Sequence, residues 1–208
     1  MKIWQASVTH LELDSIPLLT SVPYSDAVAT VVLQAKENSN RIAQKLMATV
    51  ISKAIQESFA YSSAKSLLIT PIPSSKSALR RRGEDFLKTI VRQSLDFYEA
   101  DIKRNKSAHL ITYPTVELVE LIEHRRRVKE QSGLQSHQRQ INMEGAFMVS
   151  HRRRARWAQS VAGEVILVDD VITTGSTLIA AKKALNEAGF TVISAVTACA
   201  TVRRMPIR

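Results

Sequence analysis

The stretch VILVDDVITTGST, residues 165–177, decides the fold. The apolar run over residues 164–168 predicts a buried strand, and the polar residues 169–175 predict a loop. Apolar side chains then recur at helical spacing over residues 176–188, and residues 191–198 are again apolar. A strand, a helix and a second strand within so short a span form a βαβ unit. The pattern therefore predicts an α/β fold with a mostly parallel, twisted sheet flanked by helices.

The rest of the chain carries weaker patterns that fit the same fold class. Helical spacing of apolar residues predicts helices over residues 39–59 and 83–98. A short apolar run over residues 65–70, stopped by prolines, predicts a buried strand, and residues 147–149 suggest an edge strand. Residues 114–143 are polar and basic and suggest helical fragments.

Length and composition predict one main domain. The chain has 208 residues, which we divide into an N-terminal arm over 1–24 and an α/β domain over 25–208. It contains no apolar run of about 18 residues that would predict a membrane span, and no apolar segment typical of a signal peptide. We therefore expect a cytoplasmic protein without a membrane partner. The single cysteine, Cys199, lies in an apolar run and is expected to be buried, and the histidines show no metal-ligand spacing.

The charge of the chain is concentrated in two segments. The net charge is +10, of which residues 76–82 carry +4 and residues 124–156 carry +7. Two basic segments on a nearly neutral body indicate a polyanionic ligand, either a polyphosphate or a nucleic acid. A solvated basic surface is the alternative for such arginine runs.

The second half of the opening stretch has the chemistry of a phosphate site. It supplies hydroxyl groups and a run of backbone N–H groups at the carboxyl end of a strand, where α/β proteins bind ligands. The residues are Thr173, Thr174, Gly175, Ser176 and Thr177. The glycine allows a tight turn, and the helix that follows presents its unpaired N–H groups and positive dipole end. Together these features predict binding of a phosphate monoester.

Asp169 and Asp170 precede this phosphate loop. Ionised carboxylates only accept hydrogen bonds, which suits them to the vicinal hydroxyls of a sugar. Successive side chains of a strand point to opposite faces, so a strand that stays regular through both residues allows only one to face the ribose. The other would then brace the loop backbone. Read alone, the aspartate pair could be a turn and the following residues a helix cap.

The whole string resembles the signature with which type I phosphoribosyltransferases bind phosphoribosyl pyrophosphate (PRPP). A longer resemblance, to the ComF/GntX family of phosphoribosyltransferase-like proteins, covers residues 22–200. It rests on Tyr24 and Lys36, TPIPSSKSALRRRGEDF at 70–86, EQSGL at 130–134, and Arg139, Asn142 and Phe147. The resemblance implies the type I phosphoribosyltransferase fold with a small N-terminal or hood region.

Two features depart from that family. Its four-cysteine zinc ribbon is absent, because Cys199 is the only cysteine. Its common Arg-Gly-Phe-Asn-Gln sequence is replaced by Arg-Gly-Glu-Asp-Phe, which places Glu84 and Asp85 where neutral residues are usual.

The resemblance also implies roles for individual residues. The loop with Ser74, Ser75 and Lys76 would hold pyrophosphate, helped by one or two of Arg80, Arg81 and Arg82. Arginine suits this task because it donates in pairs to phosphate oxygens. Asp169, Asp170 and Arg82 are the expected catalytic residues. A mobile cover that excludes water during the reaction would include Lys129, Gln131 and Arg139.

The expected reaction is displacement at C1 of the ribose, in which a nucleophile replaces pyrophosphate. Mg²⁺ would arrive with PRPP rather than on a protein site, and the sequence identifies neither the acceptor nor the oligomeric state. The alternative is a module without catalysis that binds PRPP, single-stranded DNA or both during competence and DNA uptake. The clusters at 125–127 and 152–154 fit DNA phosphates, although aromatic residues for base stacking are only 5%.

Overall fold

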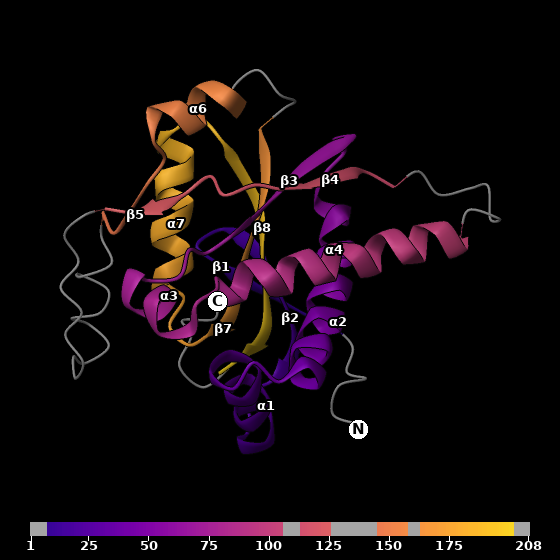
Figure 1. The fold of residues 1–208 in the computed structure, drawn as a ribbon. Coiled ribbons are helices and arrows are strands. Elements are labelled where there is room, and N and C mark those ends of the chain that lie inside the picture. Colours follow the sequence, from indigo (N-terminus) through magenta and orange to yellow (C-terminus); the bar gives the residue numbers. More distant parts are fainter. Residues whose placement is uncertain (1–7, 106–112, 126–144, 158–162, 202–208) are drawn as a thin grey trace.

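The computed structural model describes residues 8–105, 113–125, 145–157 and 163–201 (Figure 1). They form an α/β fold around a six-stranded sheet in the order β1-β2-β8-β7-β3-β4. The strands are β1 (Thr9–Leu13), β2 (Ile16–Pro23), β3 (Ser66–Pro71), β4 (Thr115–Leu118), β7 (Glu164–Ile172) and β8 (Thr191–Ala200). β1 is antiparallel to β2 and the other neighbours in the sheet pair in parallel, so the predicted fold class is confirmed.

Helices cover both faces of this sheet. They are α1 (Asp26–Glu37), α2 (Arg41–Ser58), α3 (Lys76–Arg82), α4 (Phe86–Asn105), α6 (His151–Trp157) and α7 (Ser176–Glu187), with a 3₁₀ turn, η2, at Phe59–Tyr61. Figure 1 shows α7 on one side of the sheet and α2 and α4 on the other. A separate antiparallel pair, β5 (Glu123–His124) and β6 (Phe147–Met148), lies beside α7.

The core is built where a parallel strand is covered on both faces. Residues 165–168 of β7 are fully buried, which explains their unbroken apolar run. α2 packs its buried stripe against β2, β8 and α4. Its start is fixed by Asn40, whose side chain accepts hydrogen bonds from the backbone N–H groups of Ile42 and Ala43. The helices predicted over 39–59 and 83–98 are thus confirmed as α2 and α4.

The predicted loop over residues 169–175 is wrong in its first half, because β7 continues to Ile172. Its partner β8 runs equally far, so that Asp169 pairs with Thr197 and Ile172 with Ala200. The β-branched Val171 and Ile172 suit an extended strand, and pairing with β8 outweighs the turn preference of two aspartates. The connection to α7 is therefore only residues 173–175.

Two other segments differ in detail from the sequence pattern. Where they are described, residues 114–143 form strands β4 and β5 instead of the expected helical fragments. β4 extends the sheet alongside β3, a pairing that no local periodicity encodes. Residues 9–23 of the segment expected as an N-terminal arm form β1 and β2. Within the described ranges, none of the helices is long and apolar enough to span a bilayer.

Candidate functional site

Two chain segments leave the same edge of the sheet because β3 and β7 are parallel neighbours. The β7 segment, residues 169–177, holds the two aspartates and the predicted phosphate loop. The β3 segment, residues 72–85, holds the predicted pyrophosphate loop and α3. The backbone N–H of Ile72 donates to the carbonyl of Val168 at 2.9 Å, which joins the two segments where they begin. The fold thus brings both predicted ligand loops to one edge.

The phosphate loop presents polar groups at the start of α7. Thr173 is exposed, and the hydroxyls of Thr174 and Ser176 lie 2.6 Å apart. α7 begins after Gly175 without a side-chain cap, whereas α1 is capped by Ser25 and other helices likewise carry caps. The N–H groups of its first turn, including that of Thr177, therefore remain suited to an anion.

Gly175 is required by both conformation and space. Its φ is 79°, in the left-handed region that side chains other than glycine rarely adopt. A Cβ at this position would lie 2.5 Å from Cδ1 of Leu13 in β1. The phosphate loop is therefore packed closely against the first strand of the sheet.

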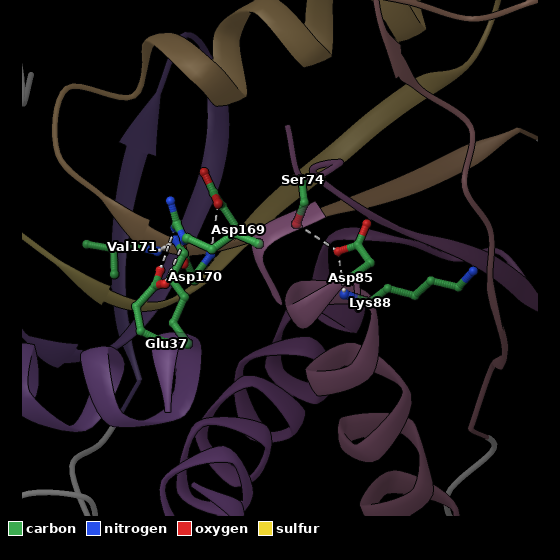
Figure 2. Close-up of polar contacts among 9 residues, drawn as sticks. Glu37, Ser74, Asp85, Lys88, Asp169, Asp170 and Val171 are labelled. Carbon is green, nitrogen blue, oxygen red and sulfur yellow. Dashed lines mark hydrogen bonds and ion pairs between the residues drawn. The ribbon is translucent and has the colours of Figure 1, made fainter. Parts of the chain in front are cut away.

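Asp169 and Asp170 point to opposite faces of the sheet, because β7 stays regular through both (Figure 2). Oδ2 of Asp170 lies 2.5 Å from Nζ of Lys36, and Asp170 is only 8% exposed. Oδ1 of Asp169 accepts a hydrogen bond from the backbone N–H of Asp170 at 2.9 Å. One carboxylate is thus paired with a cation, and the other braces the local backbone.

The surroundings of Asp169 disfavour its charged form. Burial raises the pKa of its carboxyl well above 3.8, and the neighbouring charge of Asp170 raises it further, against smaller lowering effects of the Asp170 N–H and Lys36. Thr197 of β8 pairs with Asp169 in register and Thr20 of β2 pairs with Thr197, so the three residues share one face of the sheet. Their buried hydroxyls have no hydrogen-bond partner among the described residues. This edge of the core is polar and incompletely satisfied.

The last turn of α1 connects the two segments, a link that no local sequence pattern predicts. Lys36 reaches Asp170 in the β7 segment. Its neighbour Glu37 accepts two hydrogen bonds from the guanidinium of Arg81 in the β3 segment, at 3.1 and 3.2 Å. Lys36 had only the resemblance of residues 22–200 as a signal, and Glu37 had none in the sequence.

The β3 segment is held by contacts within itself. The hydroxyl of Ser74 donates to Asp85 at 3.0 Å, and Asp85 also accepts from the backbone N–H of Lys88 at the start of α4 (Figure 2). Ser75 caps α3 by accepting from the N–H of Ala78 at 3.2 Å. Asp85, a departure from the ComF/GntX pattern, therefore acts as a helix cap beside the predicted pyrophosphate loop.

The structure separates the basic residues of this segment. Lys76 and Arg80 are exposed, and Arg81 is bound to Glu37. Arg82 differs, because its Nε and Nη1 atoms are buried and lack a hydrogen-bond partner within the described ranges. Buried guanidinium N–H groups without an acceptor are costly, so Arg82 is the arginine of this segment most in need of an anion.

Other predicted features add little to this site. Lys129, Gln131 and Arg139 lie outside the described residues. Cys199 is buried, and burial, followed by the charges of Asp170 and Asp169, raises its thiol pKa to about 12. In the described part of the chain, no group of three or more His, Cys, Asp or Glu side chains could hold a metal ion.

Sequence comparison identifies the family to which this geometry corresponds. A family model described as the phosphoribosyl transferase domain matches residues 105–208, which is half of the chain. The chain belongs to the phosphoribosyl transferase domain family. The matched half contains the complete β7 segment and α7. No curated protein matches the chain.

Solved phosphoribosyltransferase structures are among its distant neighbours. A Staphylococcus aureus hypoxanthine phosphoribosyltransferase is 11% identical with a TM-score of 0.31, and the match covers 76% of this chain and 65% of that one. The chain therefore spans less than two thirds of that enzyme's length. A Mycobacterium tuberculosis orotate phosphoribosyltransferase, in complex with Fe(III) dicitrate, is 16% identical with a TM-score of 0.33, covering 94% of this chain and 78% of that one.

Proposed function

We propose that this protein binds PRPP with Mg²⁺ at the edge of the sheet where β3 and β7 end. The observation that carries the proposal is the β7 segment, in which hydroxyls and uncapped N–H groups lie at the start of α7. In this proposal, residues 173–177 hold the 5-phosphate of the ribose. Membership of the phosphoribosyl transferase domain family supports the same ligand.

The remaining groups divide between the ribose and the pyrophosphate. Asp169 and Asp170 accept hydrogen bonds at the ribose, directly from its hydroxyls or through the loop backbone that holds them. Pyrophosphate lies against the β3 segment, where Arg82 is the main cation. The supporting residues are Ser74, Ser75, Lys76, Arg80 and Arg81. Arg81 contributes only if it leaves Glu37. Mg²⁺ would arrive as part of the substrate and offset the negative charge of its pyrophosphate.

The proposed reaction is transfer of the phosphoribosyl group. A nucleophilic acceptor forms a bond to C1 while the bond from C1 to the pyrophosphate oxygen breaks, and pyrophosphate leaves with the electron pair. A fixed cation at the departing oxygens lowers the energy of this transition state. The unpartnered guanidinium of Arg82 supports that role. The resemblance of residues 22–200 supports placing the chain in the ComF/GntX branch of the family.

Calorimetry with PRPP and Mg²⁺ tests the binding site. We expect Asp169→Asn combined with Asp170→Asn to weaken binding by roughly 10–100-fold, because the charge-assisted hydrogen bond of the one carboxylate that faces the ribose, at about 1.5–3 kcal/mol, is lost. Asp96→Asn combined with Asp101→Asn removes the same charge from α4 and should bind as the wild type does. Unchanged affinity in a folded double variant of the β7 segment contradicts the assignment.

Pyrophosphate release tests the reaction separately. The wild type is incubated with PRPP, Mg²⁺ and a panel of nucleobases and amines. We expect release that depends on one class of acceptor and is reduced in Arg82→Met. PRPP binding without release for any acceptor supports a binding module instead of a transferase.

A second candidate function is binding of single-stranded DNA, which one observation favours. The arginines Arg152, Arg154 and Arg156 of α6 are exposed, and the guanidinium of Arg156 lies 5.5 Å from the centroid of the Trp157 ring. Contacts to DNA phosphates make affinity fall with salt, so binding of an oligonucleotide is measured as salt increases. A flat salt response, or no binding at about 50 mM salt, excludes this candidate.

A further inference from the structure

A cavity of about 460 Å³ lies between α6, the β5–β6 pair and α7. One of its walls runs from Ala180 in α7 to Ala188, the residue that follows the helix. At about 1.5 Å per residue, that wall begins about 6 Å and ends about 18 Å beyond Ser176 along the axis. Figure 1 shows α6 near the end of α7 that is farther from α3. The cavity is therefore separate from the candidate PRPP site.

The floor of this cavity is apolar. It is formed by Phe147, Met148 and Val149 on one side and by Ala180 and Ala184 of α7 on the other. Phe147 is 4% exposed, and its ring packs 5.0 Å from the ring of His124. The small alanines leave the space that larger side chains would fill, and the volume falls within the roughly 300–1,000 Å³ typical of small-molecule sites.

The rim of the cavity is cationic. Arg125, Arg154 and Lys183 contribute three positive charges against one negative charge from Glu187, and His151 adds an imidazole. Arg125 is fixed by its backbone, whose N–H donates to the carbonyl of Ala146 at 2.8 Å. The guanidinium of arginine donates two parallel hydrogen bonds to the oxygens of a phosphate or a carboxylate, which a single-atom anion such as chloride cannot accept in that way.

We propose that this cavity binds a small organic phosphate of the nucleoside monophosphate class. The planar base lies against the apolar floor, and the phosphate lies at the rim between Arg125 and Arg154. An apolar body with an anionic group matches the charge and polarity of both parts of the cavity. A site of this kind is independent of PRPP binding at the β7 segment.

Nucleoside monophosphates also carry a ribose 5-phosphate and could therefore bind at the PRPP site. The test must prevent nucleotide binding there. Binding of AMP and UMP is measured by calorimetry in the Asp169→Asn, Asp170→Asn double variant. The same titration in wild type saturated with PRPP and Mg²⁺ replaces it if that variant does not fold. We expect one remaining site, which keeps the result distinct from success or failure of the proposed function.

Three variants locate that remaining site. Arg154→Gln should weaken it about 10-fold or more, because a charge-assisted hydrogen bond to phosphate is lost. Ala180→Leu should weaken it without a change of charge, because the larger side chain occupies the floor. Arg41→Gln, an exposed arginine at the start of α2, should leave it unchanged.

Several outcomes overturn the proposal. One is absence of nucleotide binding once the PRPP site is silenced, and another is equal weakening by Arg41→Gln. Inorganic phosphate binding as tightly as AMP reduces the cavity to a nonspecific anion site. Oligonucleotide binding that Arg154→Gln and Arg156→Gln weaken equally, without an effect of Ala180→Leu, assigns α6 to nucleic acid instead.

Discussion

The β7 and β3 segments leave the same edge of one sheet, yet they hold their polar groups in different ways. The β7 segment leads into a helix whose first N–H groups have no side-chain cap, and its hydroxyls pair only locally. In the β3 segment, Ser74 is bound to Asp85, Ser75 caps α3, and Arg81 is bound to Glu37.

The β7 segment can therefore bind a ligand without losing internal contacts, whereas the β3 segment must exchange internal contacts for contacts to the ligand. A phosphate at the β7 segment meets donors already in place, so little internal bonding is lost on binding. Pyrophosphate at the β3 segment would have to displace internal bonds or use the backbone and Arg82. We therefore expect substitutions in the two segments to change the stability of the free protein and its PRPP affinity in different ways.

We expect the largest effect on stability at Asp169. Its raised pKa means that the folded chain holds the proton more tightly than the unfolded chain, whose carboxyl titrates near 3.8. The free energy of unfolding therefore falls as pH rises from about 4 toward the raised pKa. Asp169→Asn should lack this fall and be more stable at neutral pH, while losing PRPP affinity. Urea unfolding of both proteins across that pH range measures the difference, and parallel curves contradict it.

Alanine substitutions at Gly175 and Gly189 distinguish the energetic cost of backbone strain from the cost of close packing. Both have positive φ, but of the two only a Cβ at Gly175 meets other atoms within 4 Å, those of the Leu13 and Ile172 side chains, with Leu13 the nearer. We expect Gly189→Ala to cost about 1 kcal/mol and Gly175→Ala about 2–3 kcal/mol, since overpacking adds to the strain. Thermal or urea unfolding checks this, and equal costs would show that Leu13 yields without penalty. Only Gly175→Ala should also weaken PRPP binding.

Arg82→Met tests whether the β3 segment keeps one cation for the ligand. In the free protein the substitution removes buried, unpartnered N–H groups, so stability should stay the same or rise. PRPP affinity should fall roughly 10–100-fold through loss of a charged hydrogen bond. Arg80→Met, at an exposed position on the same helix, is the matched control and should change neither strongly. Reduced stability with unchanged affinity would assign Arg82 a structural role.

The smallest effect is expected at Asp85. Asparagine also caps a helix start, so Asp85→Asn should keep α4 while removing a negative charge beside the β3 segment. We expect PRPP affinity to rise about 2–5-fold, a gain typical of partly exposed charges. Asp85→Ala should instead lose the cap, at a cost of about 1 kcal/mol in unfolding free energy. Weaker binding by Asp85→Asn means that Asp85 assists the ligand by holding Ser74.

Much of the fold was predictable because its signals are local. The apolar run of β7, the hydroxyls before α7 and the spacing of α2 each lie within about 20 residues, the range over which periodicity and turn chemistry act. The same local signals predicted that β7 ends before the aspartates, because they do not include the pairing of Asp169 with Thr197 in β8. They likewise do not include the pairing of β4 with β3.

The sequence by itself determined the phosphate loop and its place between strand and helix. Only the tertiary structure decided which face each aspartate takes, and that Lys36 meets Asp170 across 134 residues of chain. It also decided that Arg81 is bound to Glu37, 44 residues away, while Arg82 lacks a partner among the described residues. The physical reason is that turn and helix chemistry is set by neighbouring residues, whereas charge pairing depends on which distant elements pack together.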